Sequence, residues 1–521
     1  MHFLLKKEIL YPLAALLTGL LIVQFRVLGF DFSRIPGDLG DARFNLYILE
    51  HAYQYSTGQV SEYWSAGMMY PAQEVISYSD NLLGSSPIYS LGRIFGLSRE
   101  SAFQMWMFIV AIFNFTGAFL FFQHLVKRYD FASLGAFIYA FSIVLFSQMY
   151  HVQTMPRFAF PLALLGMYLF HQRGEWKYLA LAIWMMVWQF YCGIYLGFFA
   201  LFIIGVYVLF SLPFNRASYI NIFVKWRSHL WFYVHCILSV GAMYLLMFPY
   251  LKRSRTAIPY TLERILATVP RPGSYFYSLE DTLIWGMFSD VGDGWEWSYT
   301  QTLFLGGLAT VSLFLCLVLL VKRDFRKRLF GSRYFPLAMA CVFSFGFFIK
   351  FGSFSLYQFM IKVPGFGALR SLDRMVNLEL LFAGMALVFL LHYFFKKWKS
   401  PWFFVLVLAL LCIDNYKLNT TGVTMSKTSM QKRVDDLVVK FKGLPENSIV
   451  CYQPDSLMEN CIAYQLDAML AAQELGLRSV NGYSATSPYG FDLFWRELND
   501  AGRNKWFEMS GADTTHVVVI H

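Results

Sequence analysis

The chain has 521 residues, of which 57% are hydrophobic, 19% aromatic and only 15% charged. A soluble domain is usually about a quarter charged, so this composition excludes an ordinary soluble protein. The net charge of +10 comes from basic residues in short clusters between apolar runs, a pattern that sets membrane topology and argues against a nucleic-acid partner.

Apolar runs long enough to cross about 30 Å of hydrocarbon as helices recur along most of the chain. The first run is expected to be a retained helix, because no small-residue cleavage site follows it. We therefore predict an α-helical, polytopic membrane domain over residues 1–417 with eleven spans: 9–29, 103–126, 131–149, 157–171, 177–191, 194–212, 229–250, 300–321, 334–350, 375–395 and 401–417.

A long outer segment, residues 30–102, follows the first span and contains the sequence GDLGDARFNLYILEH. Loops of this length are usually functional. Asp38 and Asp41 lie three residues apart at the start of an expected helix, where acids can act as caps. A carboxylate at the membrane surface can also be a general base and can stabilise an oxocarbenium-like transition state. We predict Asp41 and Asp38 as catalytic candidates and Glu50, His51 and Asp80 as substrate-binding candidates.

The second long outer segment, residues 251–299, contains FSDVGDGWEW. Aromatic faces beside carboxylates suit sugar binding, so Asp290 and Trp295 are further substrate-binding candidates. An interfacial aromatic belt explains the same pattern.

The third outer segment, residues 351–374, ends with Arg370 and Arg374 at the start of a span. A spacing of four places both side chains on one helix face. Arginine binds phosphate oxygens bidentately, so this pair is predicted to hold a donor phosphate. Snorkelling of arginine at a helix end is the alternative.

Residues 418–521 differ in composition from the rest of the chain. Strands are expected over 447–452, 478–484 and 515–521, and a helix over 456–476. We predict a small α/β domain with a three-stranded sheet that packs on the membrane domain, because its own core is modest.

Basic clusters occupy every second gap between the predicted spans: Lys6 and Lys7; Lys127 and Arg128; Arg173 and Lys177; Arg216, Lys225 and Arg227; 322–328 with Arg333; and 396–399. The positive-inside rule then places the N-terminus in the cytoplasm. The three long outer segments and the C-terminal domain are predicted to be extracytoplasmic, in a multi-pass protein of the bacterial cytoplasmic (inner) membrane.

Acids in a long outer loop directly after the first span resemble the pattern of the GT-C superfamily of membrane glycosyltransferases. The stretch LRSLDR (369–374) is similar to an arginine-containing motif of bacterial members, and NGYSATSPYG (481–490) resembles a feature of their terminal outer domains. The resemblance implies a polyprenyl-phosphate or diphosphate sugar as donor, inversion at the sugar carbon, and a catalytic acid at Asp41 or Asp38. The D-x-x-D spacing is wider than the usual acid-x-acid motif, so the choice between them stays open.

The sequence therefore predicts transfer of a sugar to a lipid-linked glycan or other acceptor at the outer leaflet, for cell-envelope glycan biosynthesis. A transporter or flippase of lipid-linked sugars and a non-catalytic GT-C-like protein are the alternatives; a transporter should show inverted repeats and charges at the membrane midplane. The paired aspartates could hold Mg²⁺ or Mn²⁺, although nothing requires a metal. The spacing of His51, His151 and His171 gives no zinc signature.

Overall fold

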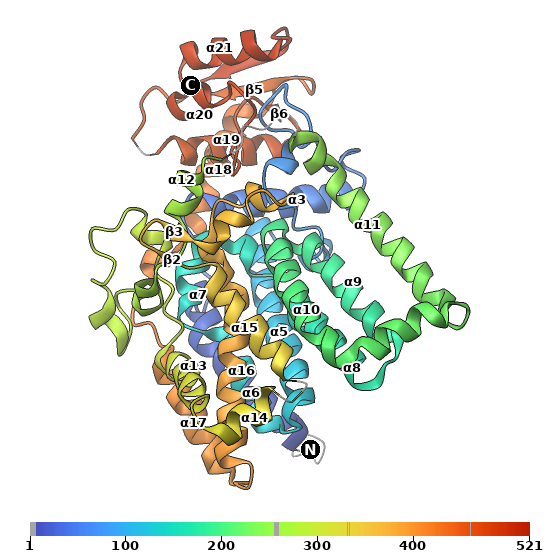
Figure 1. Cartoon of the computed structure of the whole chain (residues 1–521). Helices are drawn as coiled ribbons and strands as arrows, with labels where there is room; N and C mark the ends of the chain where they lie inside the picture. The colour runs from blue at the N-terminus through green and yellow to red at the C-terminus, as the bar shows by residue number, and fades with distance from the viewer. Residues whose placement is uncertain (1–6, 255–259, 331, 333, 459) are drawn as a thin grey trace.

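The computed structural model describes residues 7–254, 260–330, 332, 334–458 and 460–521, and it is mainly helical (Figure 1). Two residues of the predicted basic clusters, Lys6 and Arg333, lie outside the described residues. The first described helix starts at one end of a layer of long helices, and the C-terminal region covers the opposite end (Figure 1).

Each of the eleven predicted spans coincides with a helix. In chain order these are α1 and α2 (Lys7–Gly19, Phe25–Leu28) joined by a π-helical turn, α5 (Arg99–Val126), α6 (Tyr129–Phe141), α8 (Ala159–Arg173), α9 (Trp176–Cys192), α10 (Ile194–Val224), α11 (Leu230–Ser254), α13 (Gly307–Leu319), α15 (Phe335–Phe347), α16 (Val376–Phe395) and α17 (Pro401–Asp414).

Within the described ranges, six helical segments are long and apolar enough to cross a membrane, and three shorter apolar helices, α13, α15 and α17, accompany them. The six are 7–28, 99–126, 129–154, 194–224, 226–254 and 372–395. The protein is therefore an integral membrane protein with multiple candidate spans, while the count of eleven crossings stays a prediction.

Helix α6 is the centre of the helical layer, and all its residues from Asp130 to Phe141 are buried. It crosses α16 where two glycines meet: a Cβ at Gly384 would lie 2.6 Å from the carbonyl oxygen of Gly135, too close for any larger residue. Small residues at such crossings let membrane helices approach closely.

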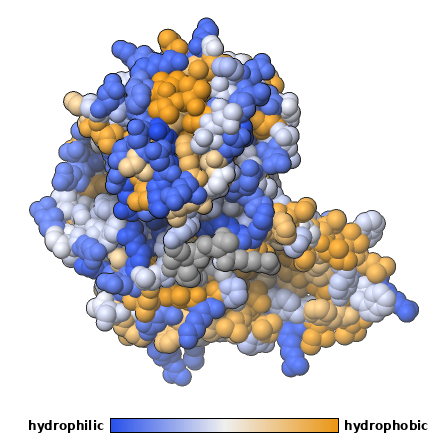
Figure 2. All heavy atoms as spheres, turned by 90° about the horizontal axis from the view of Figure 1, so that it is seen from above, coloured by the Kyte–Doolittle hydropathy of each residue, from blue (hydrophilic) through white to orange (hydrophobic). Residues whose placement is uncertain are grey.

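Apolar side chains also cover the outside of the helical layer. Figure 2, a view onto the end that carries the C-terminal region, shows hydrophilic side chains over most of that region and apolar ones over the part that projects to the right. Helix α11 lies on this side of Figure 1 and exposes Trp231, Ile237, Leu238, Val240 and Leu245. Such a large apolar surface is what a membrane would cover.

The C-terminal region contains the predicted three-stranded sheet, which is parallel with the order β6 (Arg478–Ser479), β5 (Ile449–Tyr452), β7 (Val517–Ile520). Strand β6 is shorter than expected because the Asn481 side chain takes over the pairing, accepting from Tyr452 N–H at 2.7 Å and donating to Tyr452 O at 2.9 Å. The helices are α18 (Lys427–Phe441), α19 (Cys461–Glu474, predicted as 456–476), α20 (Asp492–Glu497) and α21 (Asp500–Ser510).

The first outer segment and the C-terminal region are joined. Strand β1 (Arg34–Pro36) pairs antiparallel with β4 (Thr424–Ser426), and one hydrophobic core runs through both parts. The remaining elements are α3 (Asp41–Ser56), α4 (Ser86–Ile94), α7 (Val144–Ser147), α12 (Leu262–Ala267), α14 (Arg323–Phe330), the hairpin β2–β3 (Lys350–Phe351, Phe354–Ser355) and short 3₁₀ turns, including η3 (Gln148–Thr154) and η10 (Leu372–Met375).

Candidate active site

Helix α3 begins at Asp41, as the sequence predicts, after a tight turn through Gly37. Gly37 has φ +87°, and a Cβ there would lie 2.6 Å from the Cβ of Ala42, so only glycine fits. Gly40 is the residue that precedes the helix, and the carboxylate of Asp38 accepts its N–H at 2.9 Å. Asp38 thus stabilises the turn locally and is exposed.

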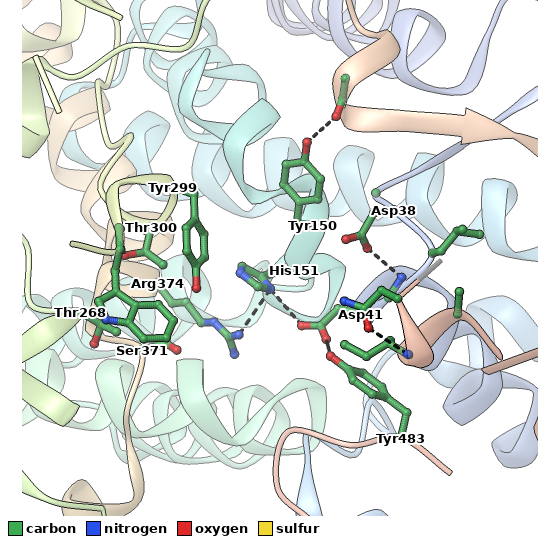
Figure 3. Close-up of a pocket in the computed structure, with 18 of the residues that line it drawn as sticks. Asp38, Asp41, Tyr150, His151, Thr268, Tyr299, Thr300, Ser371, Arg374 and Tyr483 are labelled. Atoms are coloured by element: carbon green, nitrogen blue, oxygen red, sulfur yellow. Dashed lines mark hydrogen bonds and ion pairs between the residues drawn. The ribbon is translucent and has the colours of Figure 1, made fainter. Parts of the chain in front are cut away.

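Asp41 receives hydrogen bonds from distant segments (Figure 3). His151 Nδ1 lies 3.0 Å from its Oδ2 and Gln153 Nε2 lies 3.4 Å from the same oxygen, both from η3. The Tyr483 hydroxyl, from the C-terminal region, donates to Oδ1 at 2.5 Å. Asp41 is therefore the point at which the first outer segment, η3 and the C-terminal region meet.

The environment of Asp41 keeps it ionised. Burial raises the pKa of this carboxyl, but the hydrogen bond and charge of His151, the charge of Arg374 and the Tyr483 hydroxyl together outweigh burial and hold the pKa well below its usual value. Burial and the neighbouring carboxylate raise the pKa of Tyr483 well above the usual range, so its hydroxyl remains a donor.

A cavity of about 700 Å³ opens beside Asp41. This volume lies within the range of small-molecule sites, roughly 300–1,000 Å³. Every long outer segment and the C-terminal region contribute to its wall: Gly37, Asp38, Leu39, Gly40, Asp41, Tyr150, His151, Arg264, Thr268, Trp297, Tyr299, Thr300, Arg370, Ser371, Arg374, Gly422, Thr424, Met425, Asn460, Ile462, Ala463 and Tyr483.

Three arginines, Arg264, Arg370 and Arg374, line the same cavity as Asp38 and Asp41. Their guanidinium groups lie over the aromatic rings of Trp297 at 4.1 Å, Tyr260 at 5.7 Å and Tyr195 at 4.9 Å, respectively. Among the residues that the structure describes, none of the three forms an ion pair with a carboxylate. Three cations are thus available to an anionic ligand.

The predicted helical spacing of Arg370 and Arg374 is wrong in detail, because α16 begins only at Val376. Arg374 lies in the 3₁₀ turn η10, and Arg370 precedes that turn. The chain still brings both side chains to the cavity, since the Tyr195 hydroxyl accepts the Arg370 N–H at 3.2 Å while the Tyr195 ring supports Arg374.

Asp80 does not line this cavity, but it supports it indirectly. Its Oδ1 accepts the N–H groups of Ile194 at 2.6 Å and Tyr195 at 3.3 Å, at the first turn of α10. The helix dipole favours an acid at this position. Burial raises the pKa of Asp80. Asp80 therefore fixes the residue that contacts both Arg370 and Arg374.

The other predicted substrate-binding residues lie elsewhere. Glu50 accepts from the Tyr89 hydroxyl at 2.5 Å and pairs with Arg93 at 2.9 Å. His51 lies at a second, smaller cavity. Asp290 accepts from Ser289, and the Trp295 ring supports the guanidinium of Arg271 at 4.9 Å; neither lines the cavity beside Asp41.

Sequence reasoning missed His151, Tyr483 and Arg264. One signal for His151 was available: the third predicted span ends at residue 149 and the fourth begins at 157, so His151 falls in a short outer loop. Tyr483 lies within the NGYSATSPYG stretch. Arg264 gave no signal, because it is one of several basic residues in a long outer segment.

The sequence leaves Mg²⁺ or Mn²⁺ at the paired aspartates Asp38 and Asp41 as a possibility. Both oxygens of Asp41 already accept hydrogen bonds, and Asp38 accepts from Gly40 N–H. No group of three His, Cys, Asp or Glu side chains within the described part of the chain could hold a metal ion. Enzymes that act on phosphates commonly hold Mg²⁺ with one or two carboxylates together with the substrate phosphate, so a cation shared with a bound donor stays a prediction.

No protein-family model and no curated protein matches the sequence. The solved structures that align with this chain include two transferases. The apo oligosaccharyltransferase of Archaeoglobus fulgidus aligns over 97% of this chain and 69% of its own, with a TM-score of 0.53 and 12% identity. Arabinofuranosyltransferase AftD from Mycobacteria aligns over 85% of this chain, with a TM-score of 0.48 and 14% identity, but this chain spans only 29% of it. The first likeness shows that this chain has a fold similar to that of the archaeal oligosaccharyltransferase.

Proposed function

We propose that this chain is a membrane glycosyltransferase that moves a sugar from a polyprenyl-phosphate donor to a lipid-linked glycan or other acceptor. The observation that carries the proposal is the cavity in which ionised Asp41 faces Arg264, Arg370 and Arg374, none of which has a carboxylate partner among the described residues. A phosphate is the natural ligand for such arginines. The oligosaccharyltransferase-like fold supports the same conclusion.

The two sides of the cavity have complementary roles in this proposal. The arginines hold the donor phosphate and stabilise the charge that develops as it leaves. The negative side, with Asp41, stabilises the oxocarbenium-like sugar and lies where the acceptor hydroxyl approaches. Attack from the face opposite the phosphate inverts the sugar carbon.

The topology in this proposal has eleven spans, a cytoplasmic N-terminus and an extracytoplasmic C-terminal domain over residues 418–521, in the bacterial inner membrane. The start of the first described helix and the C-terminal region lie at opposite ends of the helical layer, which supports this topology (Figure 1). A reporter active only outside the cytoplasm, fused after His521, should be active, whereas the same reporter fused after Lys399 should be silent. The reverse result would overturn the orientation.

The function is tested with purified protein in liposomes and a panel of polyprenyl-phosphate sugars carrying labelled mannose, glucose or arabinose. Release of polyprenyl phosphate and transfer of label to extracted membrane glycans are both measured. A glycosyltransferase should cleave at least one donor. Movement of intact donor across the bilayer without cleavage would identify a flippase instead, and neither event with any donor would contradict the proposal.

Loss of one cavity arginine should weaken phosphate binding. Hydrogen bonds to charged groups contribute about 1.5–3 kcal/mol, so Arg374→Ala and Arg370→Ala should each raise the Kd for polyprenyl phosphate roughly tenfold or more. Arg271→Ala is the matched control, because its guanidinium stacks on Trp295 outside the cavity. Equal affinities in the three variants and the wild type would show that these arginines do not hold the phosphate.

A further inference from the structure

The segment that carries His151 is shaped to deliver its ring to the cavity. Turn η3 leaves helical geometry at this residue, with φ −125° and ψ 60°. The ring stands between Asp41 and Arg374 (Figure 3), and its side chain is 25% exposed. Among the described residues, only Nδ1 of the ring has polar contacts: Asp41 Oδ2 lies at 3.0 Å and Arg374 Nη2 at 3.4 Å.

The partners of Nδ1 decide which ring nitrogen carries the proton. An ionised carboxylate can only accept, so the short contact with Asp41 requires a proton on Nδ1. The longer contact with Arg374, which can only donate, is then not a hydrogen bond to this nitrogen. In the neutral ring Nε2 has a free lone pair, and it has no partner within the described chain. In this tautomer Nε2 is the nitrogen that can accept a proton.

Asp41 itself is poorly suited to take a proton. Both of its oxygens already accept hydrogen bonds, and its pKa is held well below the ordinary value. A general base works best when its pKa lies near the operating pH. A carboxylate that orients an imidazole through Nδ1 and stabilises the imidazolium is instead a recurring arrangement in enzymes.

We propose that His151 is the general base of the sugar transfer and that Asp41 is its positioning residue. The proposal rests on the proposed function and deepens it. The acceptor oxygen forms a bond to the anomeric carbon, and the bond from that carbon to the phosphate oxygen breaks with its electron pair on the phosphate. The acceptor proton passes to Nε2 of His151, and the imidazolium later releases it to water.

The charged groups that face His151 come from two elements: Asp41 from α3, and Arg374 with Asp373 from η10. Asp38, Arg264, Arg370 and Tyr483 line the same cavity. If His151 is the base, protonation of its ring removes the base, so turnover of the wild type should rise with pH and the rise should be lost in His151→Gln. A carboxylate base would leave the shape of the profile unchanged in His151→Gln.

The test measures release of polyprenyl phosphate against pH in the wild type, His151→Gln, His151→Ala and the control His124→Gln, a histidine in the last turn of α5. His151→Gln should lose roughly 10²–10⁴ in turnover and the rise with pH, while still binding polyprenyl phosphate. Added imidazole should restore part of the activity of His151→Ala and none of that of His151→Gln.

Three results separate the hypotheses. A flat wild-type profile, or His151→Gln within about tenfold of the wild type with an unchanged profile, would overturn the role of His151 and leave the glycosyltransferase intact. The pH profile is measured on the wild type, so the proposal can be overturned even if a variant misfolds. No release from any donor by the wild type and the His124→Gln control would instead contradict the proposed function.

Discussion

Replacing Asp41 with Asn should lower the rate of sugar transfer roughly 10²–10⁴-fold. The change keeps the shape of the side chain but removes the charge that pairs with His151 at 3.0 Å and that faces the sugar. An amide can also donate to Nδ1 of His151 and so favour the wrong ring tautomer. The loss is thus expected whether Asp41 is the base or positions it. Transfer from a labelled polyprenyl-phosphate sugar measures it, with expression and melting temperature checked for each variant.

Asp38→Asn is the matched control, because Asp38 lines the same cavity but, among the described residues, accepts a hydrogen bond only from the Gly40 N–H. Asparagine can accept the same hydrogen bond, so this variant should keep most of its activity. If both variants turn over donor at nearly the wild-type rate, these acids only stabilise the start of α3, and the catalytic assignment fails.

Loss of the Asp467 charge should strongly destabilise the junction between α3 and the C-terminal region. Asp467 pairs with Arg43, whose side chain is fully buried, and with Arg433 at 2.6 Å. Asp467 contacts Nη2 of Arg43, whose Nε and Nη1 have no hydrogen-bond partner among the described residues. Asp467→Ala would therefore leave a buried cation unpaired, a change that typically costs about 3–5 kcal/mol. We expect a marked fall in Tm and early proteolysis of the C-terminal region.

Two further variants separate this effect from a general sensitivity to substitution. Glu508→Ala removes an exposed pair with Lys505 in α21, and such pairs contribute about 0–1 kcal/mol. The double variant Arg43→Met, Asp467→Met removes the buried cation together with its partner, so it should recover much of the lost stability. A Tm for Asp467→Ala equal to that of Glu508→Ala would show that the buried pair does not hold the two parts together.

Much of the fold follows from local sequence. The eleven helices lie where apolar runs predict them, because helix formation in a membrane depends on the length and polarity of a continuous segment. The start of α3 at Asp41 and the strands β5 and β7 also follow from local signals: an acid before an apolar helical pattern, and runs of β-branched residues. The presence of acids in the first outer segment and of the Arg370–Arg374 pair was visible in the same way.

The identity of the site was decided by tertiary structure. Asp38 and Asp41 look alike in the sequence, but only Asp41 meets His151, 110 positions away, and Tyr483, 442 positions away. Periodicity and composition predict the secondary structure of a single segment. Contacts between distant segments depend on which helix faces pack together, and on the β1–β4 pairing that brings the C-terminal region to the first outer segment. For the same reason, Glu50 was predicted as a site residue but pairs with Arg93 away from the cavity. Arg264, which the sequence did not indicate, lines the cavity.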